Sequence, residues 1–289
     1  MIVVFNPVAG RRRTNALWRV LDILSSNGVS IDLVETQCAG HATQLAREAA
    51  GAGAALVVAA GGDGTIAEVA RGLADSTTKL GVIPIGTANV LAHELDLPFI
   101  PTRIAAALAF GRTRLIWPGI VVRNTESRLF VQMLGVGFDG HVVHTLNLPL
   151  KRALGRGAYV LQTLGALRSY AFNPIRMRID RVETQTVSAI VSKGRFYGGR
   201  YNLARDADST RPGFTVSLFD RAGPLAALLA GAALPLGLMA HLPGIRRMRA
   251  LEVEFIGEES MPVQADGDAF GVTPIRITGA TAPIQIIVG

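Results

Sequence analysis

Cysteine is almost absent from this chain of 289 residues, in which Cys38 is the single example. A lone cysteine has no partner for an intrachain disulfide, which is typical of proteins from a reducing compartment. No histidine pattern of a reactive thiol accompanies Cys38, so we interpret it as an ordinary buried residue. The opening residues MIVVFNP lack the charged and apolar segments of a signal peptide. These features predict a cytoplasmic protein.

Acidic side chains are missing from two long stretches of a chain that has 29 basic and 22 acidic residues. One stretch runs from Gly140 to Ile179, and the other from Arg221 to Leu251. The bases within them are Lys151, Arg152, Arg156, Arg168, Arg176, Arg178, Arg221, Arg246, Arg247 and Arg249. Because aliphatic residues surround these bases, the pattern favours an anionic membrane over a nucleic acid as partner, with the protein peripheral at its inner face. The alternative is a solvated basic surface.

Several motifs of common enzyme classes are missing or incomplete. The sequence has no G-x-x-x-x-G-K-[ST] loop and no G-x-S-x-G elbow, which excludes P-loop chemistry and the α/β-hydrolase nucleophile. A G-x-G-x-x-G pattern spans Gly135–Gly140, but the next acid is Asp180, too distant for a ribose-binding carboxylate. We therefore predict only a tight turn there. His141 and His144 have no third ligand near them, so we expect no metal at this place.

The first part of the chain alternates apolar β-branched runs with helical periodicity, which predicts an α/β domain with a mostly parallel sheet. Hydrophobic residues make up 49% of the chain, enough for two cores at this length. The expected strands are Ile2–Asn6, Ile31–Glu35, Ala55–Ala60 and Leu80–Ile85. The expected helices are Thr14–Ser26, Ala42–Ala50, Thr65–Leu73, Thr87–Leu95 and Pro101–Phe110.

From about Leu115 the strands follow one another with few helices between them, which predicts a second, β-rich antiparallel domain. The expected strands are Leu115–Arg123, Leu129–Leu134, Ile175–Asp180, Val187–Ser192, Phe214–Phe219, Leu251–Phe255, Pro274–Ile277 and Ile284–Val288. Two interspersed helices are expected near Ala153–Tyr170 and Leu225–His241.

No Asp, Glu, Lys or Arg occurs from Pro224 to Ile245, a length that could span a bilayer. The prolines and glycines within this segment favour a broken helix instead of a membrane span. We expect it to lie against the membrane surface, anchored by the bases Arg246, Arg247 and Arg249.

Glycine-containing turns follow three of the expected parallel strands. They are Asn6-Pro7 with Gly10, then Gly61-Gly62-Asp63-Gly64-Thr65, then Gly86-Thr87-Ala88-Asn89. Glycine lets backbone amides approach a polyphosphate, and a helix N-terminus favours an anion. Ligands of such sheets bind beyond the carboxyl ends of the strands. Asp63 would repel phosphate without a cation, so it indicates Mg²⁺, the alternative being a helix cap.

These pieces resemble the diacylglycerol kinase catalytic-domain family, which includes bacterial lipid kinases, sphingosine kinases and ceramide kinases. The matching segments are Asn6-Pro-Val-Ala-Gly10, Gly61–Thr65 with Glu68, Gly86-Thr-Ala-Asn-Val-Leu-Ala92, Lys193-Gly-Arg-Phe-Tyr-Gly-Gly199 and Ala265-Asp-Gly-Asp268. They follow the family's order over nearly the whole chain. The resemblance implies a nucleotide-binding domain at residues 1–113, a lipid-substrate domain at residues 114–279 and a cleft between them. It also implies a final strand, about residues 280–289, that returns to the first domain.

The resemblance also implies roles for single residues. The positions that match ATP contacts, or lie in the same motifs, are Asn6, Gly10, Thr36, Gly61, Gly62, Asp63, Gly64, Thr65, Glu68, Gly86, Thr87 and Asn89. The implied cofactors are ATP and Mg²⁺, with Asp63 as the metal contact and a catalytic candidate. Asp266 matches the acid that takes the proton from the lipid hydroxyl. The alternative is that Asp266 caps the turn at Gly267.

Two positions depart from the family's pattern. The family usually has Asp-Gly-Glu where this chain has Asp266-Gly267-Asp268, so the second carboxylate is shorter. Bacterial relatives often carry Asp-Asp-Gly near Gly213 to hold a structural Mg²⁺, whereas this chain has Arg-Pro-Gly. We therefore predict no accessory metal, with a site rebuilt from Asp206 and Asp208 as the alternative.

The sequence predicts a lipid kinase that moves the γ-phosphate of ATP to a hydroxyl of a membrane lipid. It leaves open whether the acceptor is diacylglycerol, monoacylglycerol, a sphingoid base, ceramide or another lipid alcohol, and what the oligomeric state is. One alternative is a soluble NAD kinase, which shares the Gly-Gly-Asp-Gly turn but needs neither the apolar segment nor the clustered bases. Another is a membrane-surface regulator that binds nucleotide without turnover, and the intact Asp63 and Asp266 count against it.

Overall fold

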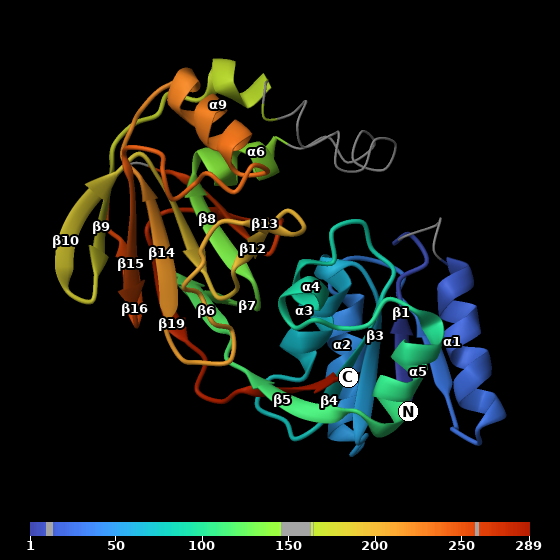
Figure 1. Ribbon diagram of the computed structural model, residues 1–289. Coiled ribbons are helices and arrows are strands. Elements are labelled where there is room, and N and C mark those ends of the chain that lie inside the picture. The colour runs from blue at the N-terminus through green and yellow to red at the C-terminus, as the bar shows by residue number, and fades with distance from the viewer. Residues whose placement is uncertain (10–13, 146–162, 164, 258–259) are drawn as a thin grey trace. The chain divides into compact units, whose positions relative to one another are not determined.

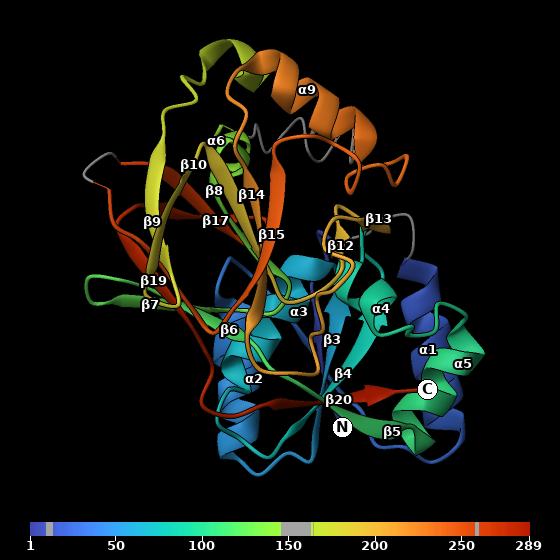
Figure 2. The same ribbon diagram turned by 60° about the vertical axis from the view of Figure 1, so that its left-hand side comes forward.

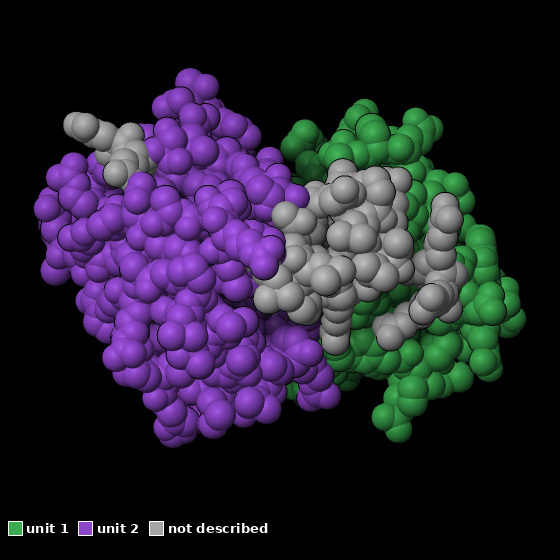
Figure 3. Space-filling model, turned by 90° about the horizontal axis from the view of Figure 1, so that it is seen from above, with its two compact units in different colours: residues 1–118, 280–289 green, residues 119–279 purple. Residues whose placement is uncertain are grey.

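The computed structural model describes residues 1–9, 14–145, 163, 165–257 and 260–289. The chain forms two compact units, one of Met1–Pro118 with Ala280–Gly289, and one of Gly119–Gly279 (Figure 3). The first is an α/β unit with a mostly parallel sheet, and the second is built from antiparallel strands (Figure 1). The predicted fold class is therefore confirmed.

The first unit has a single six-stranded sheet with helices. Its elements are β1 (Ile2–Phe5), α1 (Thr14–Ser26), β2 (Asp32–Glu35), α2 (His41–Gly51), β3 (Leu56–Gly61), α3 (Asp63–Gly72), β4 (Lys79–Pro84), α4 (Val90–Glu94), α5 (Pro101–Phe110), β5 (Arg112–Ile116) and β20 (Ile284–Val288). The strand order is β2-β1-β3-β4-β20-β5, and only β5 runs antiparallel to its neighbour. The final strand thus lies inside this sheet.

Continuous apolar runs explain the central strands of this sheet. After its first residue, β3 is buried throughout, as expected for a parallel strand covered on both faces. Helix α1 buries Leu17, Val20, Leu21 and Leu24, a stripe at helical spacing that joins α5 and the strands in one core. Because β1, β2, β3 and β4 are parallel, the turns that follow them gather at one edge of the sheet.

The second unit is a sandwich of two antiparallel sheets. Its elements are β6 (Gly119–Arg123), β7 (Glu126–Phe130), β8 (Met133–Gly137), α6 (Phe138–His144), β9 (Ile175–Ile179), β10 (Val182–Thr186), β11 (Ser188–Ser192), β12 (Phe196–Tyr197), β13 (Tyr201–Asn202), β14 (Phe214–Phe219), α9 (Pro224–Ala233), β15 (Ile245–Ala250), β16 (Glu252–Phe255), β17 (Pro262–Ala265), β18 (Asp268–Val272) and β19 (Ile275–Gly279). One sheet of the sandwich has the order β10-β9-β16-β19-β6-β7 and the other β15-β14-β11-β8-β17-β18. Strands β12 and β13 pair as a separate two-stranded sheet.

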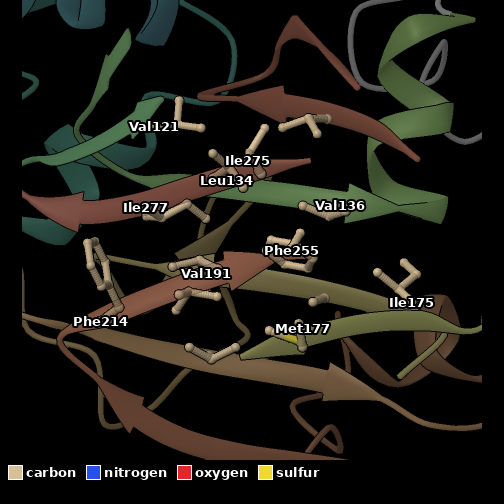
Figure 4. Close-up of a cluster of buried hydrophobic side chains, with 14 of the residues drawn as sticks. Val121, Leu134, Val136, Ile175, Met177, Val191, Phe214, Phe255, Ile275 and Ile277 are labelled. Carbon is tan, nitrogen blue, oxygen red and sulfur yellow. The ribbon is translucent and has the colours of Figure 1, made fainter. Parts of the chain in front are cut away.

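The core of the second unit lies between these two sheets (Figure 4). Val121, Met177 and Phe255 come from the first sheet, and Leu134 and Val191 from the second. Alternate residues of each strand face this core, so β11 turns Ala189 and Val191 inward and places Ser188, Ile190 and Ser192 on the opposite face. Both strand faces of β8 and β11 are nevertheless buried, because other segments cover the second sheet from outside.

Three predicted elements are wrong in extent. The expected strand Leu129–Leu134 covers the end of β7 and the start of β8, which are separate strands. The expected strand Leu115–Arg123 is two strands, β5 and β6, because Pro118 lacks a backbone N–H and interrupts the ladder. The unit boundary accordingly falls after Pro118, not at residue 113. The expected helix Leu225–His241 ends with α9 at Ala233, followed by turns around Pro235 and Gly237.

Other expectations need correction or fall outside the described residues. The bases Arg246, Arg247 and Arg249 lie on strand β15, not beside a helix. Cys38 is exposed, not buried. The Gly135–Gly140 pattern is the end of β8 followed directly by α6, not an isolated turn. Most of the helix expected near Ala153–Tyr170 lies outside the described residues. So do Gly10 and the bases Lys151, Arg152 and Arg156. Among the residues described, no helix is long and apolar enough to cross a bilayer.

Candidate functional site

The turns after β3 and β4 touch each other through their backbones. The carbonyl oxygen of Gly61 accepts hydrogen bonds from the amides of Ile85 (3.1 Å) and Gly86 (3.2 Å). A Cβ atom added to Gly62 would lie 3.3 Å from the Cα atom of Gly86, and one added to Gly86 would collide with the Cα atom of Gly62. Side chains at these two positions would push the turns apart. Glycine is therefore required at both, because the two backbones approach each other closely.

The turns after β1 and β2 join the same edge. The Asn6 side chain donates from Nδ2 to the Thr65 hydroxyl (3.2 Å), and its Oδ1 accepts from the Val8 amide (3.0 Å). The Thr36 amide donates to the carbonyl oxygen of Phe5 (2.8 Å), which places Thr36 beside the end of β1. The structure therefore brings Asn6, Thr36, the Gly61–Thr65 block and Gly86 to one edge of the sheet.

This edge fits the phosphate groups of a nucleotide. Helix α3 begins after Gly62 with no side-chain hydrogen bond at its N-cap, so its first amides point outward at the positive end of the helix dipole. A Cβ atom added to Gly64 would meet nothing within 4 Å, which leaves open space beside these amides. An anion is stabilised at such a helix N-terminus.

Asp63 caps a helix within this edge. Its Oδ1 accepts hydrogen bonds from the amides of Val90 (2.6 Å) and Leu91 (3.4 Å), the first residues of α4. Burial raises the pKa of Asp63 above its usual value, while these amide bonds lower it by less. Asp63 therefore caps α4 and not α3, the helix that follows its own turn and that the capping alternative concerned. No cluster of three or more candidate ligands occurs among the described residues, and the Mg²⁺ contact of Asp63 stays a prediction.

Three other predicted positions differ in their surroundings. The Glu68 carboxylate accepts from the Ala42 amide (3.2 Å), so it stabilises the N-terminal turn of α2. Asn89 has a positive φ of 48° and donates from Nδ2 to the Gly86 carbonyl oxygen (2.9 Å), which fixes the turn after β4. Thr87, which lies between Gly86 and Asn89 in that turn, is exposed. Glu68 thus supports a neighbouring helix, whereas Asn89 shapes the edge itself.

Asp266 lies in the tight turn between β17 and β18, with a positive φ of 52°. Its Oδ2 accepts from the Val131 amide (2.8 Å), and its Oδ1 from the amides of Gln132 (2.8 Å) and Met133 (3.1 Å). Its own amide donates to the carbonyl oxygen of Met133 (2.9 Å). Three amide donors stabilise the carboxylate as an anion and fix its orientation. Asp266 therefore caps the β7–β8 connection, and its role as a base stays a prediction.

A buried carboxylate that the sequence did not single out lies behind this turn. Asp139, at the start of α6, accepts hydrogen bonds from the Tyr197 hydroxyl and from Nε2 of Gln264 (2.7 Å). The Oε1 of Gln264 in turn accepts from the Gly267 amide (2.8 Å). Burial raises the pKa of Asp139, and its two side-chain donors lower it by less. A chain of hydrogen bonds thus connects Tyr197 to the turn that holds Asp266.

Lys193 places a cation beside Gly213, where the sequence departs from the pattern that the resemblance implies. Its buried Nζ donates to the carbonyl oxygens of Arg211 (2.8 Å) and Gly213 (2.6 Å) and lies 5.2 Å from the centre of the Phe214 ring. Asp208 accepts from the Thr210 amide (2.9 Å) and pairs with Arg211 (3.3 Å). The hydrogen bond and the ion pair of Asp208 therefore lie within its own turn, residues 208–211. Burial lowers the pKa of Lys193 from 10.5 to about 8, against a smaller opposing effect of Asp208.

Because Lys193 is buried, we expect the free energy of unfolding to depend on pH in a way that Lys193→Met removes. Between pH 8 and pH 10.5 the unfolded chain holds the lysine proton more tightly than the folded chain, so the group's contribution to stability rises with pH. Relative to Lys193→Met, the wild-type free energy of unfolding should rise by up to about 3 kcal/mol across this window. Denaturant unfolding at several pH values measures it. Lys79→Met, at an exposed lysine of the first unit, is the control and should leave the slope unchanged. Parallel curves for wild type and Lys193→Met would contradict the assignment.

Two family models together match most of the chain. One is described as the diacylglycerol kinase catalytic domain and matches residues 1–117. The other is described as the YegS C-terminal NAD kinase beta sandwich-like domain and matches residues 132–288.

Curated relatives and solved structures match over nearly the same extent. A Bacillus subtilis protein named diacylglycerol kinase is 30% identical, over 99% of this chain and 95% of its own length. A Pseudomonas aeruginosa protein named probable lipid kinase YegS-like is 30% identical, over 86% of this chain and 81% of its own length. Two Bacillus anthracis structures share the fold and are matched over the whole of this chain. One, described as a putative diacylglycerol kinase, has a TM-score of 0.81, 20% sequence identity and 94% coverage of its own chain. The other, described as a diacylglycerol kinase, has a TM-score of 0.73, 18% identity and 96% coverage of its own chain. The chain belongs to the diacylglycerol kinase family, and its C-terminal part matches the domain model named for YegS.

Proposed function

We propose that this protein transfers the γ-phosphate of ATP to a hydroxyl group of a membrane lipid. The observation that carries the proposal is the edge of the first sheet, where Gly62 and Gly86 meet backbone to backbone beside the open N-terminus of α3. Such an edge suits a polyphosphate. Membership of a lipid kinase family supports a lipid as the acceptor.

On this proposal the first unit binds and orients ATP. The amides at the start of α3 and the turn after β4 hold the phosphates, and Asn6 and Asn89 hold those turns in place. Bound Mg²⁺ would neutralise charge on the phosphates, and Asp63 is the residue that we propose to meet it. Phosphoryl transfer depends mainly on positioning and charge neutralisation, so these residues need no covalent role.

We assign the acceptor to Asp266 in the second unit. The lipid hydroxyl oxygen forms a bond to the γ-phosphorus, the bond from that phosphorus to the β–γ bridging oxygen breaks, and ADP leaves. The hydroxyl proton goes to the Asp266 carboxylate. A carboxylate that three amide donors stabilise as an anion is a weak base for an alcohol, so proton transfer comes late and orientation is the main task. The amides that fix the carboxylate support this orienting role.

Labelled ATP and a panel of acceptors test the proposal. The panel contains diacylglycerol, monoacylglycerol, a sphingoid base and ceramide in mixed micelles, with NAD as the soluble competitor. We expect label in the organic extract with at least one lipid and none in NADP. Label in NADP alone would make the protein an NAD kinase, a possibility kept in view by the name of the matching C-terminal domain. ATP binding without transfer to any acceptor would make it a regulator.

A further inference from the structure

Helix α9 has two apolar faces, of which the second unit covers one. Its sequence, PLAALLAGAA, contains no charged residue, and the chain stays uncharged as far as Ile245 except for His241. Ala233 and Met239 are buried against Met133, Ile190 and Leu203 on the outer side of the second sheet. This packing holds α9 at an end of the unit, beyond the strands (Figure 1 and Figure 2).

The other face of α9 is exposed and consists of leucines. Leu225, Leu228 and Leu229 are 70%, 46% and 50% exposed, and their i, i+3, i+4 spacing puts them on one side of the helix. At ~100° per residue, this side lies about 140° around the helix from the packed Ala230, Ala233 and Leu234.

The turns that follow α9 also expose leucines. Leu236 and Leu238 are 70% and 47% exposed. A single exposed leucine is common, whereas five within fourteen residues of the chain indicate an interaction site.

Positive charge borders this leucine face. Two of the ten bases noted in the sequence form ion pairs, Arg246 with Asp220 (2.5 Å) and Arg178 with Glu254 (2.9 Å). Arg221 lies three residues before the start of α9 and packs against Gly244, just before β15. For Arg221 no ion pair occurs among the residues that the structure describes.

Two further arginines lie on the outer side of β15. Arg247 and Arg249, paired across the ladder with Ser217 and Thr215, line a hollow of about 270 Å³. Within the described part of the chain, Nε of Arg247 and the hydroxyl of Ser217 are buried and have no hydrogen-bond partner. Asp206 also lines the hollow, and its carbonyl oxygen accepts from Arg249 (3.3 Å). Buried donors without partners are rare in proteins and indicate a missing ligand or water.

We propose that α9 and the turns after it dock the protein on an anionic lipid bilayer, with the five exposed leucines in the interface and Arg221, Arg247 and Arg249 against lipid phosphates. An uncharged, leucine-rich face bordered by arginines matches both parts of such a surface, its apolar boundary and its negative charge. The docking rests on the proposed function in that it brings the protein to the layer from which a lipid alcohol is drawn.

Vesicle flotation with matched variants tests the leucines. The full chain should float with phosphatidylglycerol vesicles and much less with phosphatidylcholine vesicles. Replacing Leu225, Leu228 and Leu229 together with Ser should weaken binding to the anionic vesicles at least ~10-fold, because each serine removes apolar contact with the interface. The control changes three exposed apolar residues elsewhere, Phe110→Ser, Val182→Ser and Leu251→Ser, and should leave the affinity unchanged. Equal binding by wild type and the leucine variant would overturn the proposal and leave the face to a protein partner.

The arginines are tested by salt and by substitution. Arg247→Ser and Arg249→Ser should each lower affinity for phosphatidylglycerol vesicles by roughly five-fold, the equivalent of about 1 kcal/mol per base near a charged surface. The same variants should flatten the salt dependence of binding. Free inorganic phosphate, added as a competitor, distinguishes a site for soluble phosphate from one for headgroups. Undiminished binding in both variants would remove the arginines from the docking surface.

A reporter variant keeps the test independent of loss of fold and of the kinase reaction. Leu228→Trp places an indole on the exposed face, and its emission should shift to the blue with anionic vesicles, beyond any change seen for wild-type Trp18 and Trp117. No shift would overturn the docking even if lipid is phosphorylated. A shift without kinase activity would uphold the docking and refute the proposed function. With a short-chain acceptor free in solution, the triple leucine variant should keep wild-type turnover.

Discussion

Asp266→Asn should lower kcat for lipid phosphorylation by about 10²–10⁴-fold, the usual contribution of a general base. The change also affects folding, because one carboxylate oxygen becomes an amide nitrogen that cannot accept a hydrogen bond. Either the Val131 amide, or the amides of Gln132 and Met133, then lose their acceptor. An unpaired buried amide costs roughly 1–3 kcal/mol, so the free energy of unfolding should fall by about that amount. Thermal unfolding and initial rates on the same preparation separate the two effects.

The neighbouring carboxylate provides the matched control for this prediction. Asp268 is exposed at the start of β18, so Asp268→Asn makes the same change of charge two residues away. It should keep both the rate and the stability near those of wild type. If Asp266→Asn loses stability while its folded fraction keeps full specific activity, Asp266 is only a cap. If Asp268→Asn alone loses activity, the base is Asp268.

Gly62→Val should weaken ATP binding by roughly 10–100-fold. A side chain at this position must grow toward Gly86, whose Cα atom lies 3.3 Å from the expected Cβ position, or into the space proposed for the phosphates. Overpacking of this kind costs about 1–3 kcal/mol, which corresponds to that range of affinity. Titration calorimetry on the folded variant measures the change.

Another glycine of the same unit serves as the control for Gly62→Val. Gly51 ends α2, and a Cβ atom added to it meets nothing within 4 Å. Gly51→Val should therefore bind ATP like the wild type. Unchanged binding by a folded Gly62→Val protein would place the phosphates elsewhere.

The accuracy of the sequence-based fold differs with the kind of segment. Helices α1 and α5 and strands β14 and β20 have the predicted bounds, since each is a strongly apolar or amphipathic run. Strand β15 was missed because three of its six residues are arginines, and β10 because it is a polar strand at a sheet edge. Edge strands need little apolar character, so hydrophobic pattern alone does not find them.

The candidate site shows a similar division. Turns after parallel strands must meet at one edge, so the sequence could place the Gly61–Thr65 and Gly86–Asn89 segments together. The sequence could not show that Asp63 and Asp266 accept hydrogen bonds from backbone amides of distant turns, because these bonds depend on which turns lie beside each carboxylate in the fold. Nor could it find Asp139, whose partners Tyr197 and Gln264 lie 58 and 125 residues away in the chain. Asp139 lies within the G-x-G-x-x-G pattern of Gly135–Gly140, which is typical of dinucleotide binding and not of a buried carboxylate.

The most direct test of the central claim is a single competition measurement that follows the fate of the ATP γ-phosphate. Purified protein, ATP, Mg²⁺, NAD and vesicles of phosphatidylglycerol that contain diacylglycerol, monoacylglycerol, a sphingoid base and ceramide are incubated together, and ³¹P NMR identifies each phosphate product. We expect a new lipid phosphomonoester that increases as ADP increases, and that is reduced to a small fraction with Asp266→Asn. Formation of NADP without any lipid phosphomonoester, or release of inorganic phosphate alone, would contradict it.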